Sequence, residues 1–226
     1  DFIPEDVPVA MADISDLKMT IVTNDPTKRY YYTLLFDDKY RVKIATRNIN
    51  IPGVQNFRDL GGYPSYSTKK QMRWGMIYRS AEIDSLECSS RRELKNLGIK
   101  TLIDLRASSE IGRQSPLQKG FNVVHIPLAT GDMEDILKGI REEKIKSDTV
   151  YRMVERMNRI LIDQYTKEYR QIFDILLDKN SYPVVIHCSS GKGRTGIVSA
   201  LVLAALGINE DIIMEDYRLS NDYFNI

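Results

Sequence analysis

The sequence predicts an α/β protein in which a central, mostly parallel sheet is flanked by helices and preceded by a small antiparallel β unit. From Gly53 onward, short apolar runs alternate with amphipathic helical patterns, which is typical of a layered α/β domain. Before that point the chain carries β-branched and aromatic runs separated by turn residues. We therefore expect a β unit over residues 1–50 and a second, larger domain over residues 51–226.

Three stretches predict the β unit. Residues 19–23 and 30–36 are β-branched or aromatic runs, and residues 40–45 alternate between apolar and polar types as a half-exposed strand does. The polar segment 37–39 supplies a turn between the last two stretches. Nothing in this unit indicates catalysis.

The larger domain is predicted to contain strands over 76–79, 101–105, 123–127 and 182–186, and helices over 90–97, 134–140, 149–178 (a pair) and 195–206. The helix over 90–97 begins with a capping box formed by Ser90 and Glu93. The strand over 182–186 is apolar on both faces, so we expect it at the centre of the sheet. The connection over 128–148 is too long and polar for a tight turn and is expected to form a lid.

The most informative segment runs from His187 to Gly196 and reads His-Cys-Ser-Ser-Gly-Lys-Gly-Arg-Thr-Gly. It joins the predicted central strand to a helix, so its backbone N–H groups and the helix N-terminus can surround an anion. Such an environment favours the thiolate form of Cys188, and the planar fork of Arg194 can hold two phosphate oxygens. The expected phosphate-binding residues are Ser189, Ser190, Gly191, Lys192, Gly193, Arg194 and Thr195. The chemistry indicated is attack of Cys188 on phosphorus.

Composition and residue counts argue against several other classes of function. The net charge of +1 gives no broad attraction to nucleic acid or to a membrane surface. Cys88 and Cys188 are the only cysteines, and His125 and His187 the only histidines, and their spacing fits neither a metal site nor a cysteine–histidine protease. We expect no metal, no cofactor, no disulfide framework, no nucleic-acid partner and no membrane-spanning segment.

Five segments carry a resemblance to a known family: residues 56–63 (Asn-Phe-Arg-Asp-Leu-Gly-Gly-Tyr), 78–80 (Tyr-Arg-Ser), 103–106 (Ile-Asp-Leu-Arg), 187–196 and 216–221 (Asp-Tyr-Arg-Leu-Ser-Asn). Over about residues 54–222 the chain resembles the atypical bacterial protein tyrosine phosphatases, a branch of the cysteine-dependent phosphatases. The resemblance implies a phosphomonoesterase that works through a cysteinyl-phosphate intermediate at Cys188 and binds a phosphate ion in its loop. Members of that family act on phosphotyrosine and, in several cases, on phosphoinositides or phosphoserine and phosphothreonine.

The chain departs from the family pattern in two places. Gly193 stands where the family usually has an aspartate, which restores the loop form of the eukaryotic-type tyrosine phosphatases. The sequence also ends at Ile226, before the helices that can cover the active site in the family, so we expect a truncated C-terminus. It begins at Asp1 rather than methionine, which is compatible with a removed leader and with export.

A cysteine phosphatase also needs a general acid to protonate the leaving group. The resemblance implies a mobile aspartate in the polar segment after the strand over 123–127. Asp132 is the first candidate there, and Glu134 and Asp135 are alternatives. We interpret Asp104, at the end of its own strand, as an ion-paired structural residue.

The sequence therefore favours hydrolysis of phosphotyrosine-type phosphoesters, on a phosphorylated protein or a small phospho-compound. Two alternatives stay open. An inositol phosphate or phosphoinositide phosphatase would make use of the extra cation at Lys192, whereas Gly193 and the nearly neutral net charge favour phosphotyrosine. A phospho-binding pseudophosphatase would bind phosphate without turnover, although such a protein has no need of the nucleophile Cys188.

Overall fold

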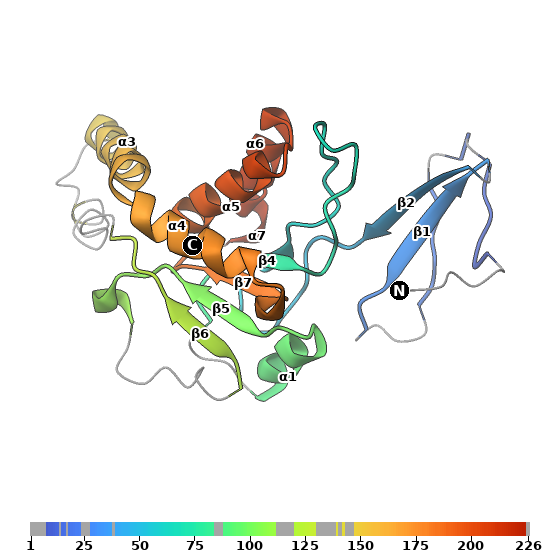
Figure 1. Ribbon diagram of the computed structural model, residues 1–226, viewed down its shortest axis with the longest axis horizontal. Coiled ribbons are helices and arrows are strands. Elements are labelled where there is room, and N and C mark those ends of the chain that lie inside the picture. The colour runs from blue at the N-terminus through green and yellow to red at the C-terminus, as the bar shows by residue number, and fades with distance from the viewer. Residues whose placement is uncertain are drawn as a thin grey trace. The chain divides into compact units, whose positions relative to one another are not determined.

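The computed structural model describes residues 8–13, 15–16, 18–23, 28–37, 39–83, 88–111, 120–129, 139, 142 and 147–224. The chain divides into two compact units, Asp1–Thr46 and Arg47–Ile226. The first unit contains a two-stranded sheet and the second a five-stranded sheet with its helices (Figure 1).

The first unit contains an antiparallel hairpin of β1 (Tyr31–Phe36) and β2 (Tyr40–Ala45). The turn is closed by a hydrogen bond of 3.0 Å from Lys39 N to the Phe36 carbonyl. The antiparallel pair confirms the predicted β unit, but the strand predicted over residues 19–23 is wrong, because that segment forms no strand. Residues with β propensity form a strand only where a neighbouring strand completes the hydrogen-bonded ladder.

The sheet of the second unit has the strand order β3-β4-β7-β5-β6. Its strands are β3 (Arg58–Asp59), β4 (Ile77–Ser80), β5 (Thr101–Asp104), β6 (Asn122–His125) and β7 (Val184–His187). β3 is antiparallel to β4, and all the other neighbours are parallel. β7 is central and buried over its whole length, which confirms the mostly parallel sheet and the central strand predicted from the sequence.

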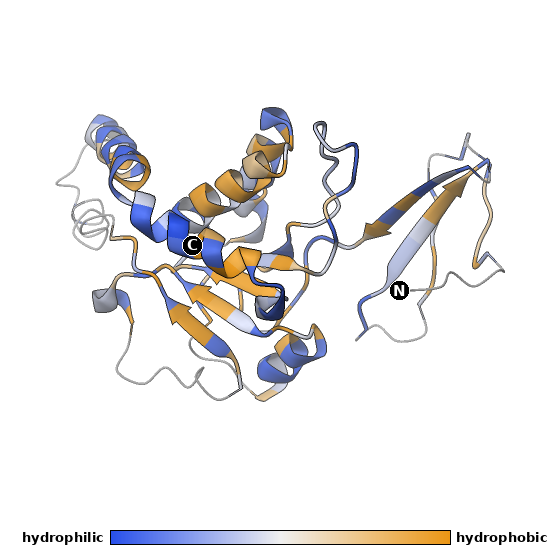
Figure 2. Cartoon of the chain, viewed as in Figure 1, coloured by the Kyte–Doolittle hydropathy of each residue, from blue (hydrophilic) through white to orange (hydrophobic). Residues whose placement is uncertain are grey.

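Helices cover both faces of this sheet. They are α1 (Cys88–Asn96), α3 (Ser147–Gln164), α4 (Thr166–Leu177), α5 (Gly193–Ala205), α6 (Glu210–Arg218) and α7 (Ser220–Tyr223), with short 3₁₀ helices η1 (Ser108–Glu110) and η3 (Lys179–Ser181). Alternate residues of β7 belong to two different cores: Val184 and Ile186 pack with α3, α4 and α5, whereas Val185 packs with Leu94 of α1. Figure 2 shows the resulting apolar strands and the strongly apolar α5.

The capping box predicted for the first helix is wrong. Helix α1 already begins at Cys88, so Ser90 lies inside its first turn and is fully buried. Its hydroxyl donates a hydrogen bond of 2.6 Å to the Pro52 carbonyl, a tertiary partner that replaces the expected cap. The helix ends at Asn96, and Gly98, its predicted stop, follows with a φ of 72°.

Except for Gly139, the helix predicted over 134–140 lies outside the described residues, as does most of the polar connection over 128–148. No helix in the described part of the chain combines the length and the apolar character needed to cross a membrane.

Candidate active site

Residues 188–194, which we call the phosphate loop after the role predicted for it, leave the carboxyl end of β7 and enter α5. Cys188 follows the strand directly and is 1% exposed. Gly191 has a φ of 69°, and a Cβ atom there would lie 2.4 Å from the Ser80 carbonyl oxygen. Only glycine therefore allows the loop backbone to pack against the end of β4. Lys192, at the N-cap of α5, adds no capping hydrogen bond from its side chain, so the first N–H groups of the helix can donate hydrogen bonds to an anion.

Arg194 is held at the loop by a carboxylate. Its two terminal nitrogens donate to the two carboxylate oxygens of Glu110, and Nη2 also lies 3.2 Å from Ser189 Oγ. Ser189 Oγ in turn donates to Glu110 Oε1 over 2.6 Å. Burial opposes ionisation of Glu110, but the hydrogen bonds from Arg194 and Ser189 outweigh it and lower its pKa to about 2. The guanidinium fork is thus fixed by a carboxylate that stays ionised at any physiological pH.

Sequence reasoning missed Glu110. Its signal was its position: η1 follows β5, and β5 pairs in parallel with β7, so the segments after both strands meet at one edge of the sheet. The structure also brings Cys188 and Arg194 together, as predicted. The pKa of Arg194 is raised, because the Glu110 hydrogen bond and the charge of Cys188 outweigh the opposing effect of burial.

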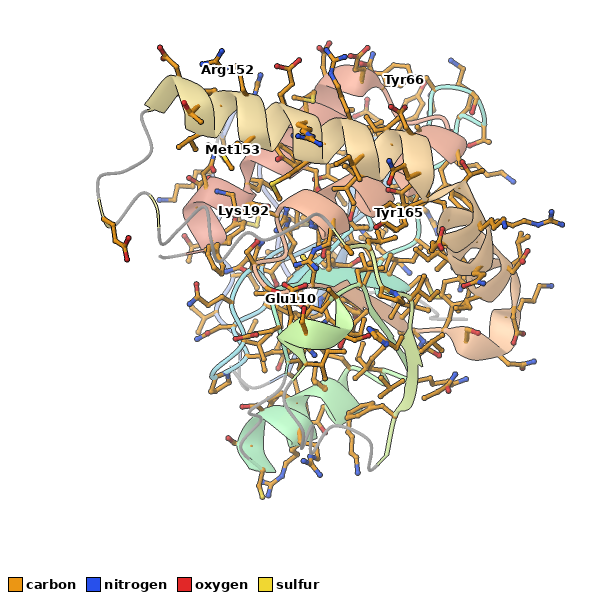
Figure 3. All side chains as sticks on the ribbon, turned by 90° about the vertical axis from the view of Figure 1, so that its left-hand side faces the viewer. Tyr66, Glu110, Arg152, Met153, Tyr165 and Lys192 are labelled. Carbon is orange, nitrogen blue, oxygen red and sulfur yellow. The ribbon has the colours of Figure 1, made fainter. Side chains whose placement is uncertain are left out.

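Lys192 lies at the rim of the loop. Its ammonium group donates to Asn221 Oδ1 at 2.9 Å, a neutral partner, and no carboxylate among the described residues forms an ion pair with it. In Figure 3, Lys192 and Glu110 lie on one side of the domain, below helix α3, which carries Arg152 and Met153. A cation is therefore available beside the site, as the sequence indicated.

A buried polar network supports the loop from behind. Arg58 Nε lies 3.4 Å from Asp216 Oδ1, and Arg79 Nη1 lies 2.7 Å from Asp216 Oδ2. The Tyr63 hydroxyl donates to the same carboxylate at 3.0 Å. Burial and the neighbouring charge of Arg79 lower the pKa of Arg58 to about 10, although Asp216 opposes the shift. Two guanidinium groups therefore share one carboxylate directly behind the loop.

Asp104 is a structural residue, as interpreted from the sequence. Its carboxylate receives hydrogen bonds from Arg106, the shortest at 2.6 Å, and lies 3.9 Å from His187 Nδ1. Burial raises the pKa of Asp104, but the Arg106 hydrogen bonds and the His187 charge lower it further than burial raises it. A carboxylate held in this way is a poor proton donor.

The three general-acid candidates, Asp132, Glu134 and Asp135, lie outside the described residues. Their role stays a prediction. Among the described residues, no group of three or more histidine, cysteine, aspartate or glutamate side chains is arranged to hold a metal ion.

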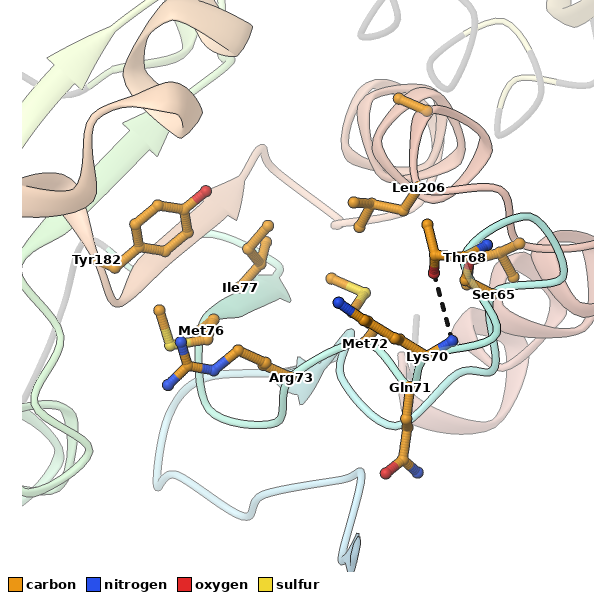
Figure 4. Close-up of a pocket in the computed structure, with 12 residues that line it drawn as sticks. Ser65, Thr68, Lys70, Gln71, Met72, Arg73, Met76, Ile77, Tyr182 and Leu206 are labelled. Atoms are coloured by element: carbon orange, nitrogen blue, oxygen red, sulfur yellow. Dashed lines mark hydrogen bonds between the residues drawn. The ribbon is translucent and has the colours of Figure 1, made fainter. Parts of the chain in front are cut away.

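A cavity of about 370 Å³ lies at the opposite end of the sheet (Figure 4). Ile77 at the start of β4, Tyr182 just before β7 and Leu206 just after α5 line it. Neither Cys188 nor Arg194 belongs to its lining, so it is separate from the phosphate loop.

Residues 49–226 match a family described as the tyrosine phosphatase family. The triple specificity protein phosphatase PtpB of Mycobacterium tuberculosis is 32% identical over 194 residues, which cover 76% of this chain and 68% of that protein. A tyrosine-protein phosphatase of Nostoc commune is 26% identical over 148 residues, which cover 64% of this chain and 48% of that protein. Among solved structures, the Siw14 catalytic core matches with a TM-score of 0.43 and 18% identity, over 63% of this chain and 69% of that one. The chain thus spans from about half to two thirds of the length of these curated relatives.

Proposed function

Because this chain belongs to the tyrosine phosphatase family, we propose that it hydrolyses phosphate monoesters through a covalent intermediate on Cys188. One observation carries the proposal. Cys188 and Arg194 lie on a single loop between the buried β7 and α5, and Glu110 fixes the Arg194 fork beside the thiol. A binding module needs the fork but has no use for a buried thiol at the same place.

In the first step, Cys188 Sγ attacks phosphorus and the bond from phosphorus to the leaving oxygen breaks. The loop N–H groups and Arg194 hold the phosphoryl oxygens as charge develops on them. The leaving oxygen takes a proton from the general acid, for which Asp132 is our proposed residue.

In the second step, water attacks phosphorus, the phosphorus–sulfur bond breaks and the acid residue takes up the proton of the water. We assign to Thr195 the role of assisting the departing thiolate, because it directly follows Arg194 in the loop. Its hydroxyl oxygen is fully buried and has no hydrogen-bond partner among the described residues, so no described group competes for this hydroxyl. The two steps together return the enzyme to its starting state and release inorganic phosphate.

For the substrate, phosphotyrosine-type aryl phosphates are the first choice. Gly193 supports it, because a Cβ atom at this position would meet nothing within 4 Å. The loop thus has room for a side chain at this position but presents none, so Gly193 adds neither bulk nor charge there. The Nostoc relative is named a tyrosine-protein phosphatase, and the mycobacterial relative is named for triple specificity. The charge of Lys192, whose described partner Asn221 is neutral, keeps inositol phosphates and phosphoinositides as the second candidate.

A substrate panel tests this choice. The values of kcat/KM are compared for a phosphotyrosine peptide, a phosphoserine peptide, a phosphoinositide and inositol hexakisphosphate. Lys192→Ala and a control, Lys179→Ala, are tested in parallel. Lys179 lies in η3, which precedes the start of β7, whereas the phosphate loop follows the end of that strand. We expect the highest kcat/KM on the phosphotyrosine peptide, with little change in either variant.

A higher kcat/KM on an inositol compound, lost in Lys192→Ala and kept in Lys179→Ala, would overturn this preference. Absence of turnover on every substrate, with tight binding of inorganic phosphate retained, would identify a pseudophosphatase.

A further inference from the structure

Three consecutive carbonyl groups of the phosphate loop are each held by a donor from outside the loop. The Ser189 carbonyl accepts from Glu82 N at 3.0 Å, the Ser190 carbonyl from Asn56 Nδ2 at 3.1 Å, and the Gly191 carbonyl from Arg79 Nη2 at 2.8 Å. All three donors belong to the segments around β3 and β4. Two of these donors, Asn56 and Arg79, are side-chain groups, so a substitution can remove each of them without removing a main-chain hydrogen bond.

The direction of each carbonyl fixes the direction of an N–H group. In a planar trans peptide the C=O and the following N–H point in opposite directions. Holding the carbonyls of Ser190 and Gly191 against β3 and β4 therefore turns the N–H groups of Gly191 and Lys192 toward the other side of the loop. We infer that Asn56 and Arg79 are positioning residues that orient these N–H groups for the phosphoryl oxygens. This inference rests on the proposed use of the loop as a phosphate cradle.

Arg79 is itself held rigidly. It is 1% exposed, and while Nη2 contacts the loop, Nη1 donates to Asp216 Oδ2 at 2.7 Å. Asp216 also receives hydrogen bonds from Arg58 and Tyr63. Because two guanidinium groups share this one carboxylate, the cluster of Arg58, Arg79 and Asp216 carries a net positive charge, which favours an anion on the opposite side of the loop.

Asn56 has an orientation that its neighbours define. Its Oδ1 accepts a hydrogen bond from Arg58 Nη1, so Nδ2 is the atom that faces the Ser190 carbonyl. Its backbone φ of 57° lies in the left-handed region, which asparagine adopts more readily than most residues. Lys192 N, whose direction Arg79 sets, makes only a long contact of 3.4 Å with Ser190 Oγ, which a phosphoryl oxygen can replace.

The test uses two variants and a matched control. Arg79→Lys leaves a single ammonium group that cannot serve both Asp216 and the Gly191 carbonyl. Asn56→Asp keeps the acceptor for Arg58 and replaces the donor to the Ser190 carbonyl by an oxygen. The control is Arg47→Lys, because Arg47 also donates to main-chain carbonyls, those of Asp59 and Gly61, but does not contact the loop.

Three quantities are measured for each protein at a temperature well below its Tm: the inhibition constant of vanadate, the affinity for inorganic phosphate by calorimetry, and kcat/KM on an aryl phosphate. The Tm of each protein is measured separately. We expect Arg79→Lys and Asn56→Asp each to weaken vanadate and phosphate binding about tenfold or more, as loss of a hydrogen bond that orients a charged ligand site implies. The control should lower Tm and leave oxyanion binding unchanged.

Oxyanion affinity at the wild-type level in both variants, together with a lower Tm, would overturn the inference and leave the two residues a structural role. If Arg79→Lys does not fold, the oxyanion affinity of Asn56→Asp alone tests the inference. A wild-type protein that binds phosphate but hydrolyses nothing would contradict the proposed function, and the binding data would still test the positioning role.

Discussion

Substitution of Glu110 by glutamine tests how the arginine of the loop is held. In the wild-type protein, each carboxylate oxygen receives one terminal nitrogen of Arg194, and Oε1 also accepts from Ser189. Oε2 additionally accepts from the Ala107 N–H at 2.7 Å. Glutamine keeps one acceptor oxygen and places an NH₂ group on the other side, where it faces a donor. The fork therefore loses one of its two charge-assisted hydrogen bonds.

A hydrogen bond to a charged group contributes about 1.5–3 kcal/mol, and partial exposure places this one at the lower end. The Arg194 side chain is 11% exposed and that of Glu110 33% exposed. A loss of about 1.5 kcal/mol in transition-state stabilisation corresponds to roughly a tenfold fall in kcat/KM. We expect this fall mainly in kcat, because the fork is needed most where charge develops on the phosphoryl oxygens.

The assay is steady-state hydrolysis of an aryl phosphate, with the vanadate inhibition constant measured beside it. Glu155→Gln is the control, since Glu155 pairs with Arg159 on the exposed surface of α3 and contributes little. Tighter vanadate binding by Glu110→Gln would refute the reasoning, because it would show that Glu110 competes with the phosphoryl group for Arg194.

The pH dependence gives a second check on Glu110. Its pKa is lowered from an ordinary value of 4.5 to about 2, so its contribution to stability is fully present above pH 4.5 and is lost as the pH falls toward 2. The Tm difference between wild type and Glu110→Gln should therefore be constant from about pH 5 to 8 and shrink below about pH 4.5.

Three other substitutions have defined outcomes. Cys188→Ser should abolish hydrolysis of an aryl phosphate and keep measurable vanadate or phosphate binding; a wild-type rate in this variant would rule out covalent catalysis at Cys188. Asp132→Asn should lower kcat by about 10²–10⁴ on substrates with poor leaving groups and much less on activated aryl phosphates. Equal rates on both substrate types would move the acid role to another group. Gly191→Ala should lower Tm and weaken vanadate binding, since its Cβ would lie 2.4 Å from the Ser80 carbonyl oxygen; unchanged melting would mean that the loop can shift.

The parts that the sequence predicted correctly depend on local pattern. The central strand was predicted because Val184, Val185 and Ile186 are consecutive apolar residues, and burial on both faces requires this pattern. The loop between β7 and α5 was predicted because its residues are contiguous, so the change from strand to helix can be read from the local pattern. Its role in binding phosphate stays a prediction.

The parts that were missed or wrong depend on partners far away in the sequence. Glu110 meets Arg194 only because β5 lies beside β7 in the sheet. Ser90 does not cap α1, because its hydroxyl bonds to the carbonyl of Pro52, thirty-eight residues earlier. Residues 19–23 have β propensity but form no strand in the described structure, and propensity alone gave no sign of this.

The shared carboxylate of Asp216 has a consequence for the order of folding. Asp216 is separated from Arg58 by 158 residues and from Arg79 by 137, and its contacts with them are what brace the loop. Contacts between such distant positions form late, because the chain must first lose the entropy of closing a very long loop. During synthesis, β7 and Cys188 emerge before α6, so the newly made chain carries Cys188 before Asp216 is present to brace the loop. Recovery of oxyanion binding in a refolding experiment should therefore lag behind the appearance of helical and sheet structure. The length of this lag would measure how late α6 packs against the rest of the domain.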